Sequence, residues 1–373
     1  MIKLSSSSLD TKEYIAVKKI LQSNYLGMGP EVKKFEDNLK KFLKREIVCV
    51  SSGTAALQLA LQALGLKKNS EIIIPSLNFI SGYHAIIANN LKPVLCDINK
   101  ETLSIDIEDL KKKITKRTKA IIPVYYSGYA YDNLLQIYKI AKIHKLRVVE
   151  DAAHAFGSYY NKKLIGSFGD ISCFSFDGIK NITSGEGGCV VTNDKKIINK
   201  IKDYRFLSIV KESEKRYVKK KGYFYDIKEI GWRYHMSDIM AAIGNVQLKK
   251  INLFRKKRLK LLSLYKKKLF NNKKIELLFQ DNNIYCPHIS VIKSKKKINR
   301  KHLKNYFDKK KIEIGYNWKP IHKLTIFKKN NIKKVALQNT NYIAERIFSV
   351  PLHYNLKKKD VIKISNLINE YFK

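Results

Sequence analysis

Residues 148–193 read VVEDAAHAFGSYYNKKLIGSFGDISCFSFDGIKNITSGEGGCVVTN, and this stretch decides which fold the sequence predicts. An apolar run opens it and ends in Glu150 and Asp151. A second apolar run, residues 171–176, leads to Lys180, and a glycine-rich turn precedes a third run at 189–192. Short apolar runs bounded by glycine and polar residues indicate buried strands. Because functional groups in open α/β sheets lie where strands end, Asp151 and Lys180 are candidate site residues.

An acid and a lysine at neighbouring strand ends are the pair that pyridoxal phosphate (PLP) chemistry needs. The lysine forms a Schiff base with the cofactor, and the acid keeps the pyridine nitrogen protonated so that the ring can accept electrons. The alternatives are a surface lysine, common in so basic a chain, and an aspartate that only caps a helix.

The chain on either side of this stretch alternates between strand and helix patterns. Strands are expected at 46–50, 72–75, 93–97, 120–125 and 148–151, and helices after residue 54, after residue 81, near 107–114 and near 134–144. This alternation favours a mostly parallel, doubly wound α/β sheet flanked by helices. Residues 271–373 mix strands and helices, so we expect a large domain over 1–250 and a smaller α+β domain over 251–373.

Length and composition fit a large globular protein. The 373 residues, 45% of them hydrophobic, can form two or more domains. No apolar run reaches the roughly 18 residues of a membrane span, and the start, MIKLSSSSLD, lacks an apolar signal region. We therefore expect a soluble cytoplasmic protein. The five cysteines show no CxxC spacing, so we expect buried thiols and no metal site.

A formal net charge of +42 raises the question of nucleic-acid binding. The lysines are spread in short runs along the chain, and no helix-turn-helix, zinc-finger or RNP-like motif accompanies them. We expect solvated helix faces and no nucleic-acid or membrane partner. The positive charge could still attract an anionic substrate such as a sugar nucleotide.

Several motifs together resemble the DegT/StrS family of PLP-dependent nucleotide-sugar aminotransferases. The family has the fold type I architecture of aspartate aminotransferase, with a seven-stranded sheet. The resemblance covers nearly the whole chain and rests on these stretches: SSGTAALQLAL (51–61), IIPSLNFIS (73–81), VVEDAAHAFGSYY (148–160), GSFGDISCFSFDGIKNITSGEGGCVVTND (166–194), YHMSDIMAAIGNVQL (234–248), PIHKL (320–324) and ERIFSVPLH (345–353).

The resemblance implies roles for three catalytic residues. Lys180 carries the cofactor and shuttles a proton between the amino donor and the cofactor. Asp151 holds the pyridine nitrogen. His154 lies near the ring oxygen of the cofactor, where the alternative is a packed core histidine.

Four further residues match cofactor-binding positions of the family. Phe79 stacks on the pyridine ring, although an aromatic residue is also a common core residue. Gly53, Thr54 and Ser175 bind the phosphate, the first two through backbone N–H groups at a helix start. Ser175 lies five positions before Lys180, as the family pattern requires.

Two positions depart from the family pattern. The loop that reaches the phosphate from the neighbouring subunit has His235 where Asn or Arg is usual; a histidine can donate a hydrogen bond there or serve a structural role. If His235 serves the phosphate, each active site is shared across a homodimer. Asp177 stands where the similar UDP-4-keto-pentose branch has histidine, which leaves the sugar preference open.

The resemblance implies amino transfer from L-glutamate to a keto sugar nucleotide. The motifs IKNIT and EGG resemble members that form 4-amino sugars, so we expect C4 of a dTDP- or UDP-4-keto-6-deoxyhexose, for O-antigen or other surface glycans of bacteria. C3 amination of a 3-keto-6-deoxy sugar is the alternative, and GDP is a third possible nucleotide. A PLP-dependent sugar dehydratase, a non-catalytic regulator of this fold and a basic binding protein are rival functions; Lys180 argues against the dehydratase.

Overall fold

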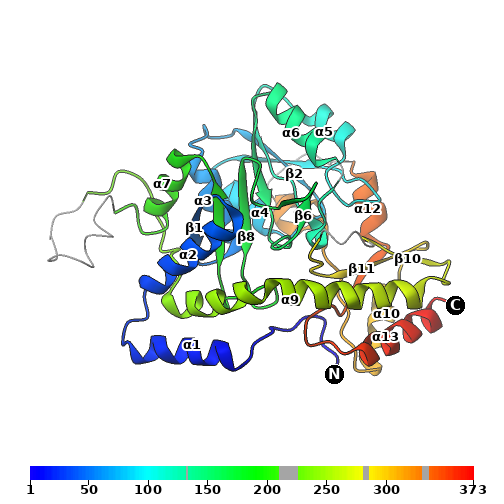
Figure 1. Cartoon of the computed structure of the whole chain (residues 1–373). Coiled ribbons are helices and arrows are strands. Elements are labelled where there is room, and N and C mark those ends of the chain that lie inside the picture. Colours follow the sequence, from blue (N-terminus) through cyan, green and yellow to red (C-terminus); the bar gives the residue numbers. More distant parts are fainter. Residues whose placement is uncertain (132, 210–225, 280–284, 330–335) are drawn as a thin grey trace.

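The computed structural model describes residues 1–131, 133–209, 226–279, 285–329 and 336–373. Figure 1 shows a central sheet between helices, with the long helix α9 crossing the whole molecule below it. Within the described ranges, no helix combines the length and the apolar character that a membrane crossing requires.

The central sheet has seven strands in the order β1-β9-β8-β5-β4-β2-β3. Strands β8, β5, β4, β2 and β3 pair in parallel, and β9 is antiparallel to both β1 and β8. The expected mostly parallel seven-stranded sheet is therefore confirmed. The strand bounds are β1 Glu46–Val50, β2 Glu71–Pro75, β3 Lys92–Cys96, β4 Thr118–Ile121, β5 Arg147–Asp151, β8 Ile171–Ser175 and β9 Gly188–Thr192.

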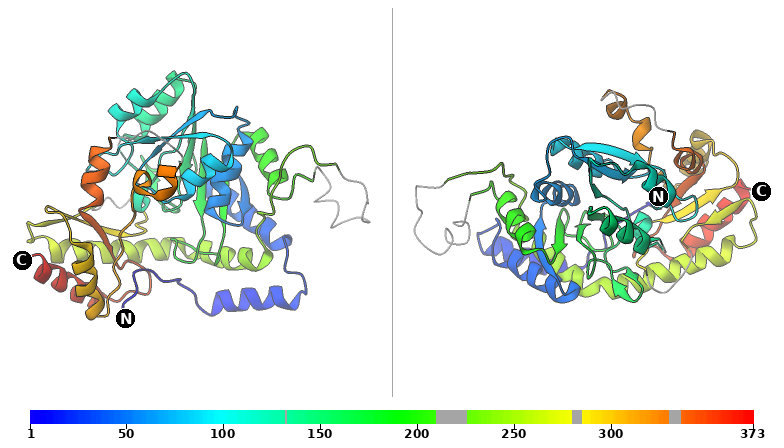
Figure 2. Two further views of the ribbon diagram at one scale, coloured as in Figure 1. Left: turned by 180° about the vertical axis from the view of Figure 1, so that it is seen from behind. Right: turned by 90° about the horizontal axis from the view of Figure 1, so that it is seen from above.

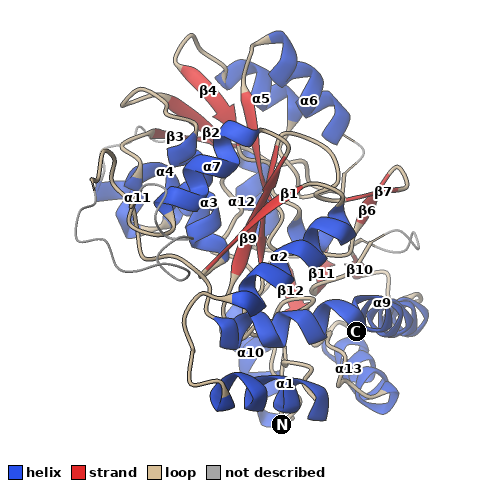
Figure 3. Cartoon of the chain, turned by 60° about the vertical axis from the view of Figure 1, so that its left-hand side comes forward, coloured by secondary structure: helices blue, strands red, loops and turns tan. Residues whose placement is uncertain are grey.

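Helices cover both faces of this sheet (Figure 3). Successive side chains of a strand point to opposite faces, so in β1 Val48 and Val50 join the core under α3 and α7, whereas Ile47 and Cys49 join the core under α2 and α9. The helices of this part are α1 Thr11–Gln22, α2 Pro30–Leu43, α3 Gly53–Ala63, α4 Ser81–Ala88, α5 Ile107–Lys113, α6 Leu134–Ile143, α7 Lys195–Tyr204 and α9 Asp238–Leu269, with the short helix η1 Tyr126–Gly128.

The C-terminal part is a smaller α+β unit, seen beside the sheet in Figure 2. An antiparallel sheet of β10, β11 and β12 packs with α10 and α13 around its own core. Because α9 runs unbroken through residue 250, both parts share one helix, and we keep the division at 250–251 as a proposal. The remaining bounds are β6 Tyr159–Tyr160, β7 Lys163–Leu164, β10 Ile275–Leu277, β11 Ser290–Ser294, β12 Ile347–Val350, α10 Arg300–Lys309, η2 Ile321–Lys323, α11 Thr325–Lys329, α12 Gln338–Ala344 and α13 Lys358–Tyr371.

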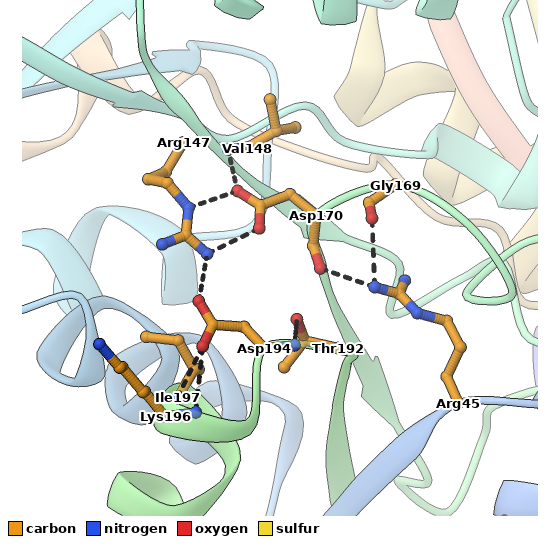
Figure 4. Close-up of polar contacts among 9 residues, drawn as sticks. All are labelled: Arg45, Arg147, Val148, Gly169, Asp170, Thr192, Asp194, Lys196 and Ile197. Atoms are coloured by element: carbon orange, nitrogen blue, oxygen red, sulfur yellow. Dashed lines mark hydrogen bonds and ion pairs between the residues drawn. The ribbon is translucent and has the colours of Figure 1, made fainter.

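An ion-pair cluster fixes three central strands at one edge of the sheet (Figure 4). Arg147, at the start of β5, binds both carboxylate oxygens of Asp170, just before β8, at 2.7 Å each. The same guanidinium lies 3.4 Å from Asp194, which follows β9 and caps the N-terminus of α7. A planar guanidinium holds two carboxylates in fixed directions. The cluster therefore ties the starts of β5 and β8 to the end of β9 at this edge, away from the opposite ends of the strands.

All five cysteines are buried free thiols, as the sequence predicts.

Candidate active site

The opposite edge of the sheet brings together the chain segments that the motifs single out. Asp151 is the last residue of β5, Ser175 is the last residue of β8, and Gly188 begins β9. Gly188 pairs with Ser175 on one side and with Val50, the end of β1, on the other. The edge therefore carries an acid, a hydroxyl and the turn into helix α3 on neighbouring strands.

Asp151 and Lys180 act on each other electrostatically at this edge. Asp151 is only 5% exposed, and its Oδ1 accepts a hydrogen bond from the Ala153 N–H at 3.2 Å. Burial raises the pKa of the Asp151 carboxyl, while the Ala153 N–H and the charge of Lys180 lower it. Burial lowers the pKa of the Lys180 amine, and the charges of Asp177 and Asp151 oppose that shift. The structure thus gives the Lys180 amine a lowered pKa within the electrostatic reach of a buried carboxyl group.

His154 lies against a second histidine that the motifs did not indicate. The ring centroids of His154 and His288 are 4.2 Å apart, and both side chains are buried. Burial and the nearby charge of Lys180 hold the pKa of His154 well below its ordinary value, and burial also lowers that of His288. Within the described part of the chain, neither Nδ1 atom has a hydrogen-bond partner. Both imidazoles are therefore neutral, and both retain unused hydrogen-bonding capacity at the site.

The loop after β2 supplies an exposed aromatic ring and a buried amide. Phe79 is 51% exposed, and its ring centroid lies 6.0 Å from that of Trp318. Asn78 is 3% exposed; its Oδ1 accepts from the Phe79 N–H at 2.7 Å, and its amide favours the ionised form of Asp151. The half-exposed Phe79 ring is available to a planar ligand.

The start of α3 forms an anion cradle with the end of β8. Ser52 caps the helix through a bond from the Ala55 N–H to its Oγ at 3.1 Å, and the first N–H groups of a helix, here those of Gly53 and Thr54, have no intrahelical acceptor. A Cβ atom on Gly53 would lie 2.8 Å from the Ser175 Cβ. Only glycine therefore lets the helix start approach the Ser175 hydroxyl so closely.

His235 lies near this cradle in the same chain. The neighbouring carbonyl of Tyr234 accepts a hydrogen bond from the Ser51 N–H at 2.7 Å, so the segment packs against the end of β1. The His235 ring contacts Phe206 at a centroid distance of 5.1 Å, and burial lowers its pKa. His235 can thus donate a hydrogen bond as a neutral ring; its role at a phosphate of the neighbouring subunit stays a prediction.

The donor set of the site fits pyridoxal phosphate. A phosphate needs N–H and hydroxyl donors, which Gly53 and Ser175 offer; a pyridine nitrogen needs a buried acid, and an aldehyde needs an amine of lowered pKa. Asp151 and Lys180 meet these two needs. A metal site was not found: among the described residues, no group of three or more His, Cys, Asp or Glu side chains is arranged to hold a metal ion.

Sequence reasoning missed the residues that hold the site from the C-terminal part. His288 belongs to the stretch CPHIS, which has no local pattern of a functional site. Its neighbour Cys286 is held by Asn181, whose Nδ2 donates to the carbonyls of His154 at 3.2 Å and Cys286 at 3.0 Å. Asn181 directly follows Lys180 in the sequence. Its position next to the candidate lysine is the signal by which sequence reasoning could have found Asn181.

The chain is similar to known aminotransferases over nearly its full length. The profile described as the DegT/DnrJ/EryC1/StrS aminotransferase family matches residues 7–369. GDP-perosamine synthase of Escherichia coli O157:H7 is 33% identical over 371 residues, which cover 98% of this chain and 97% of that protein.

Solved structures have the same fold. Helicobacter pylori PseC, an aminotransferase involved in the biosynthesis of pseudoaminic acid, aligns with a TM-score of 0.90 and 28% identity over 99% of this chain and 98% of that one. Spr1654 of Streptococcus pneumoniae, solved in a PMP form and in a PLP form, aligns in the PMP form with a TM-score of 0.92 and 25% identity over 100% of both chains.

Proposed function

We infer that this chain, which belongs to the DegT/DnrJ/EryC1/StrS aminotransferase family, is an enzyme for 4-amino sugars. In the proposed reaction it moves an amino group from L-glutamate to C4 of a nucleotide-linked 4-keto-6-deoxyhexose. The chain is a PLP-dependent sugar aminotransferase of this family. The position on the sugar, the donor and the nucleotide are our proposal. The observation that carries it is full-length similarity to a sugar nucleotide aminotransferase together with the Asp151 and Lys180 pair at one buried edge.

The choice of C4 rests on two supports. The motifs IKNIT and EGG resemble members that form 4-amino sugars, and GDP-perosamine synthases of Escherichia coli and Vibrio cholerae are similar to this chain at 33% and 30% identity. The names of those two relatives carry GDP, whereas the motifs favour dTDP or UDP. We therefore propose the 4-keto-6-deoxyhexose and test the three nucleotides separately. The proposed products serve O-antigen or other surface glycans.

We propose separate roles in amino transfer for Asp151 and Lys180. When bound, PLP supplies an aldehyde that accepts the amino group and a ring that accepts electrons. We propose that Asp151 keeps a proton on the ring nitrogen. Burial raises the pKa of its carboxyl, and the Ala153 N–H and the charge of Lys180 oppose that shift and favour the ionised form that this role needs. Lys180 accepts and returns the proton of the donor carbon, for which its lowered pKa suits it.

The other site residues hold and orient the cofactor. We propose that Gly53, Thr54 and Ser175 bind the phosphate, that Phe79 stacks on the pyridine ring and that His154 lies near the ring oxygen. A neutral His154 does not repel the positive charge of the ring nitrogen. His235 would then contact the phosphate in a homodimer whose sites are shared, and sedimentation of an active monomer would contradict that arrangement.

The decisive experiment offers keto sugar nucleotides and L-glutamate to the purified, PLP-loaded protein and locates the new amine by NMR. The panel crosses 4-keto and 3-keto 6-deoxyhexoses with dTDP, UDP and GDP, and Lys180→Ala is the control without a proton acceptor. We expect an amine at C4 only. Amination at C3 alone would replace the proposal by the C3 reaction, and failure of every sugar despite bound PLP would favour a regulator of this fold.

A further inference from the structure

A chain of side-chain hydrogen bonds joins the C-terminal part to the loop that follows β2. Ser76 Oγ lies 2.7 Å from His322 Nδ1, and His322 Nε2 lies 3.1 Å from Asn341 Oδ1. The backbone adds a third link, because the Ile321 N–H donates to the Ser76 carbonyl at 2.9 Å. The Ser76, His322 and Asn341 side chains, called here the Ser76 relay, connect residues more than 240 positions apart.

The partners of His322 define which of its nitrogens carries the proton. Asn341 Oδ1 can only accept a hydrogen bond, so Nε2 of a neutral ring is the donor. Nδ1 then has a free lone pair and accepts the hydroxyl proton of Ser76. Burial lowers the pKa of His322, which favours this neutral form, and the charges that face the ring are those of Lys323 and Asp97. Every polar atom of the imidazole is therefore used within the relay.

Both ends of the relay are held by the sheet. The Ser76 N–H donates to the Cys96 carbonyl at 3.0 Å, and Ser76 is fully buried. At the other end, Asp97 receives the N–H and the hydroxyl of Thr340, both at 2.7 Å, and the N–H of Asn339 at 2.9 Å. These bonds cap α12, and Asn341 lies on the first turn of that helix. The relay is thus anchored at the ends of β2 and β3, and it has little freedom to shift.

The loop fixed by the relay carries two groups of the candidate site. Asn78 follows Ser76 by two residues, and its side chain is buried. Its amide acts on the neighbouring Asp151 carboxyl and lowers the pKa of that group. Phe79 follows directly, tied to Asn78 by the 2.7 Å bond. A shift of Ser76 would therefore move the amide beside Asp151 and the exposed ring together.

We propose that His322 is a positioning residue, which acts through Ser76 to hold Asn78 beside Asp151 and Phe79 at the cofactor ring. This inference rests on the proposed cofactor site. In this proposal His322, from the C-terminal part, determines the surroundings of Asp151, the acid that would contact the ring nitrogen.

The test measures PLP binding and the pH midpoint of the visible absorbance of the bound cofactor. The variants are Ser76→Ala, His322→Leu and the double variant, with His322→Asn to restore an acceptor near the Nδ1 position. His302→Leu is the matched control, because His302 also bonds through Nδ1, to Tyr371 at 2.8 Å, but at an exposed site. Urea unfolding of each apo variant shows whether the fold is kept.

We expect each single variant to bind PLP about 3- to 10-fold more weakly, the effect of one net hydrogen bond. The pH midpoint of the absorbance should shift by about 0.3 pH units or more. The PLP affinity of the double variant should equal that of the weaker single variant, and His322→Asn should recover part of the lost affinity. Groups that act as one unit are non-additive in this way.

The failures of the two proposals are distinguishable. If the unaltered protein takes up no PLP, the proposed function fails. If it binds PLP and the relay variants behave like His302→Leu, or if the two single effects add, the relay does not position the site.

Discussion

Replacing Gly53 by alanine tests the anion cradle directly. The added Cβ would lie 2.8 Å from the Ser175 Cβ, 3.3 Å from its Oγ and 3.4 Å from its Cα. Carbon atoms in contact normally lie about 3.5–4.0 Å apart, so Ser175 or the start of α3 must move by roughly 0.7 Å. Rotation of the Ser175 side chain cannot relieve the contact, because its nearest atom is Cβ. Overpacking of this kind costs about 1–3 kcal/mol.

The displacement also moves the Ser175 hydroxyl away from a bound phosphate. A hydrogen bond to a charged group contributes about 1.5–3 kcal/mol, so Gly53→Ala should weaken PLP binding by about 10- to 150-fold. Titration of the apo protein with PLP, followed by absorbance, measures the loss, and urea unfolding measures the strain.

Gly178→Ala is the matched control for this prediction. A Cβ atom there would meet Gly185 O and Ser7 Oγ at an ordinary 3.6 Å. If Gly53→Ala shows the strain in unfolding but binds PLP as tightly as the unaltered protein, the phosphate does not lie at this helix start.

Three further predictions concern the Lys180 amine, the buried histidines and the ion-pair cluster. Lys180→Ala should slow the reaction of the PLP-loaded protein with L-glutamate by at least about 10²-fold, as seen by absorbance, since it removes the proton acceptor. His154 and His288 are buried with lowered pKa values, so below about pH 6.5 the unfolded chain binds more protons. The free energy of unfolding should therefore fall on acidification from pH 6.5 to 5, by up to about 1.4 kcal/mol per pH unit for each ring, and less steeply in His288→Asn; a pH-independent urea midpoint would contradict this. Arg147→Met should lower the free energy of unfolding by about 1–2 kcal/mol, because Asp170 loses a bidentate, partly buried partner, while PLP affinity stays unchanged; a loss of affinity would show that the cluster influences the site.

The sequence alone determined the architecture of the sheet, and it indicated the acid and the lysine of the candidate site. Apolar runs of strand length mark β5, β8 and β9; Asp151 is the last residue of β5, and Lys180 lies five positions after the end of β8. Such features are local, because strand propensity, turn glycines and the spacing between Ser175 and Lys180 are properties of short segments. Because the motifs are local, their resemblance to the family was enough to predict both the family and its cofactor.

Only the tertiary structure decided which distant side chains lie around the candidate site. His288 comes from a stretch without a functional pattern, yet it packs on His154 at 4.2 Å. His322 was visible only as a letter of the motif PIHKL, and its bond to Ser76 spans 246 positions. The physical reason is that these contacts depend on how the C-terminal part docks against the ends of β2 and β5. That docking is fixed by packing over the whole chain, and no short segment encodes it.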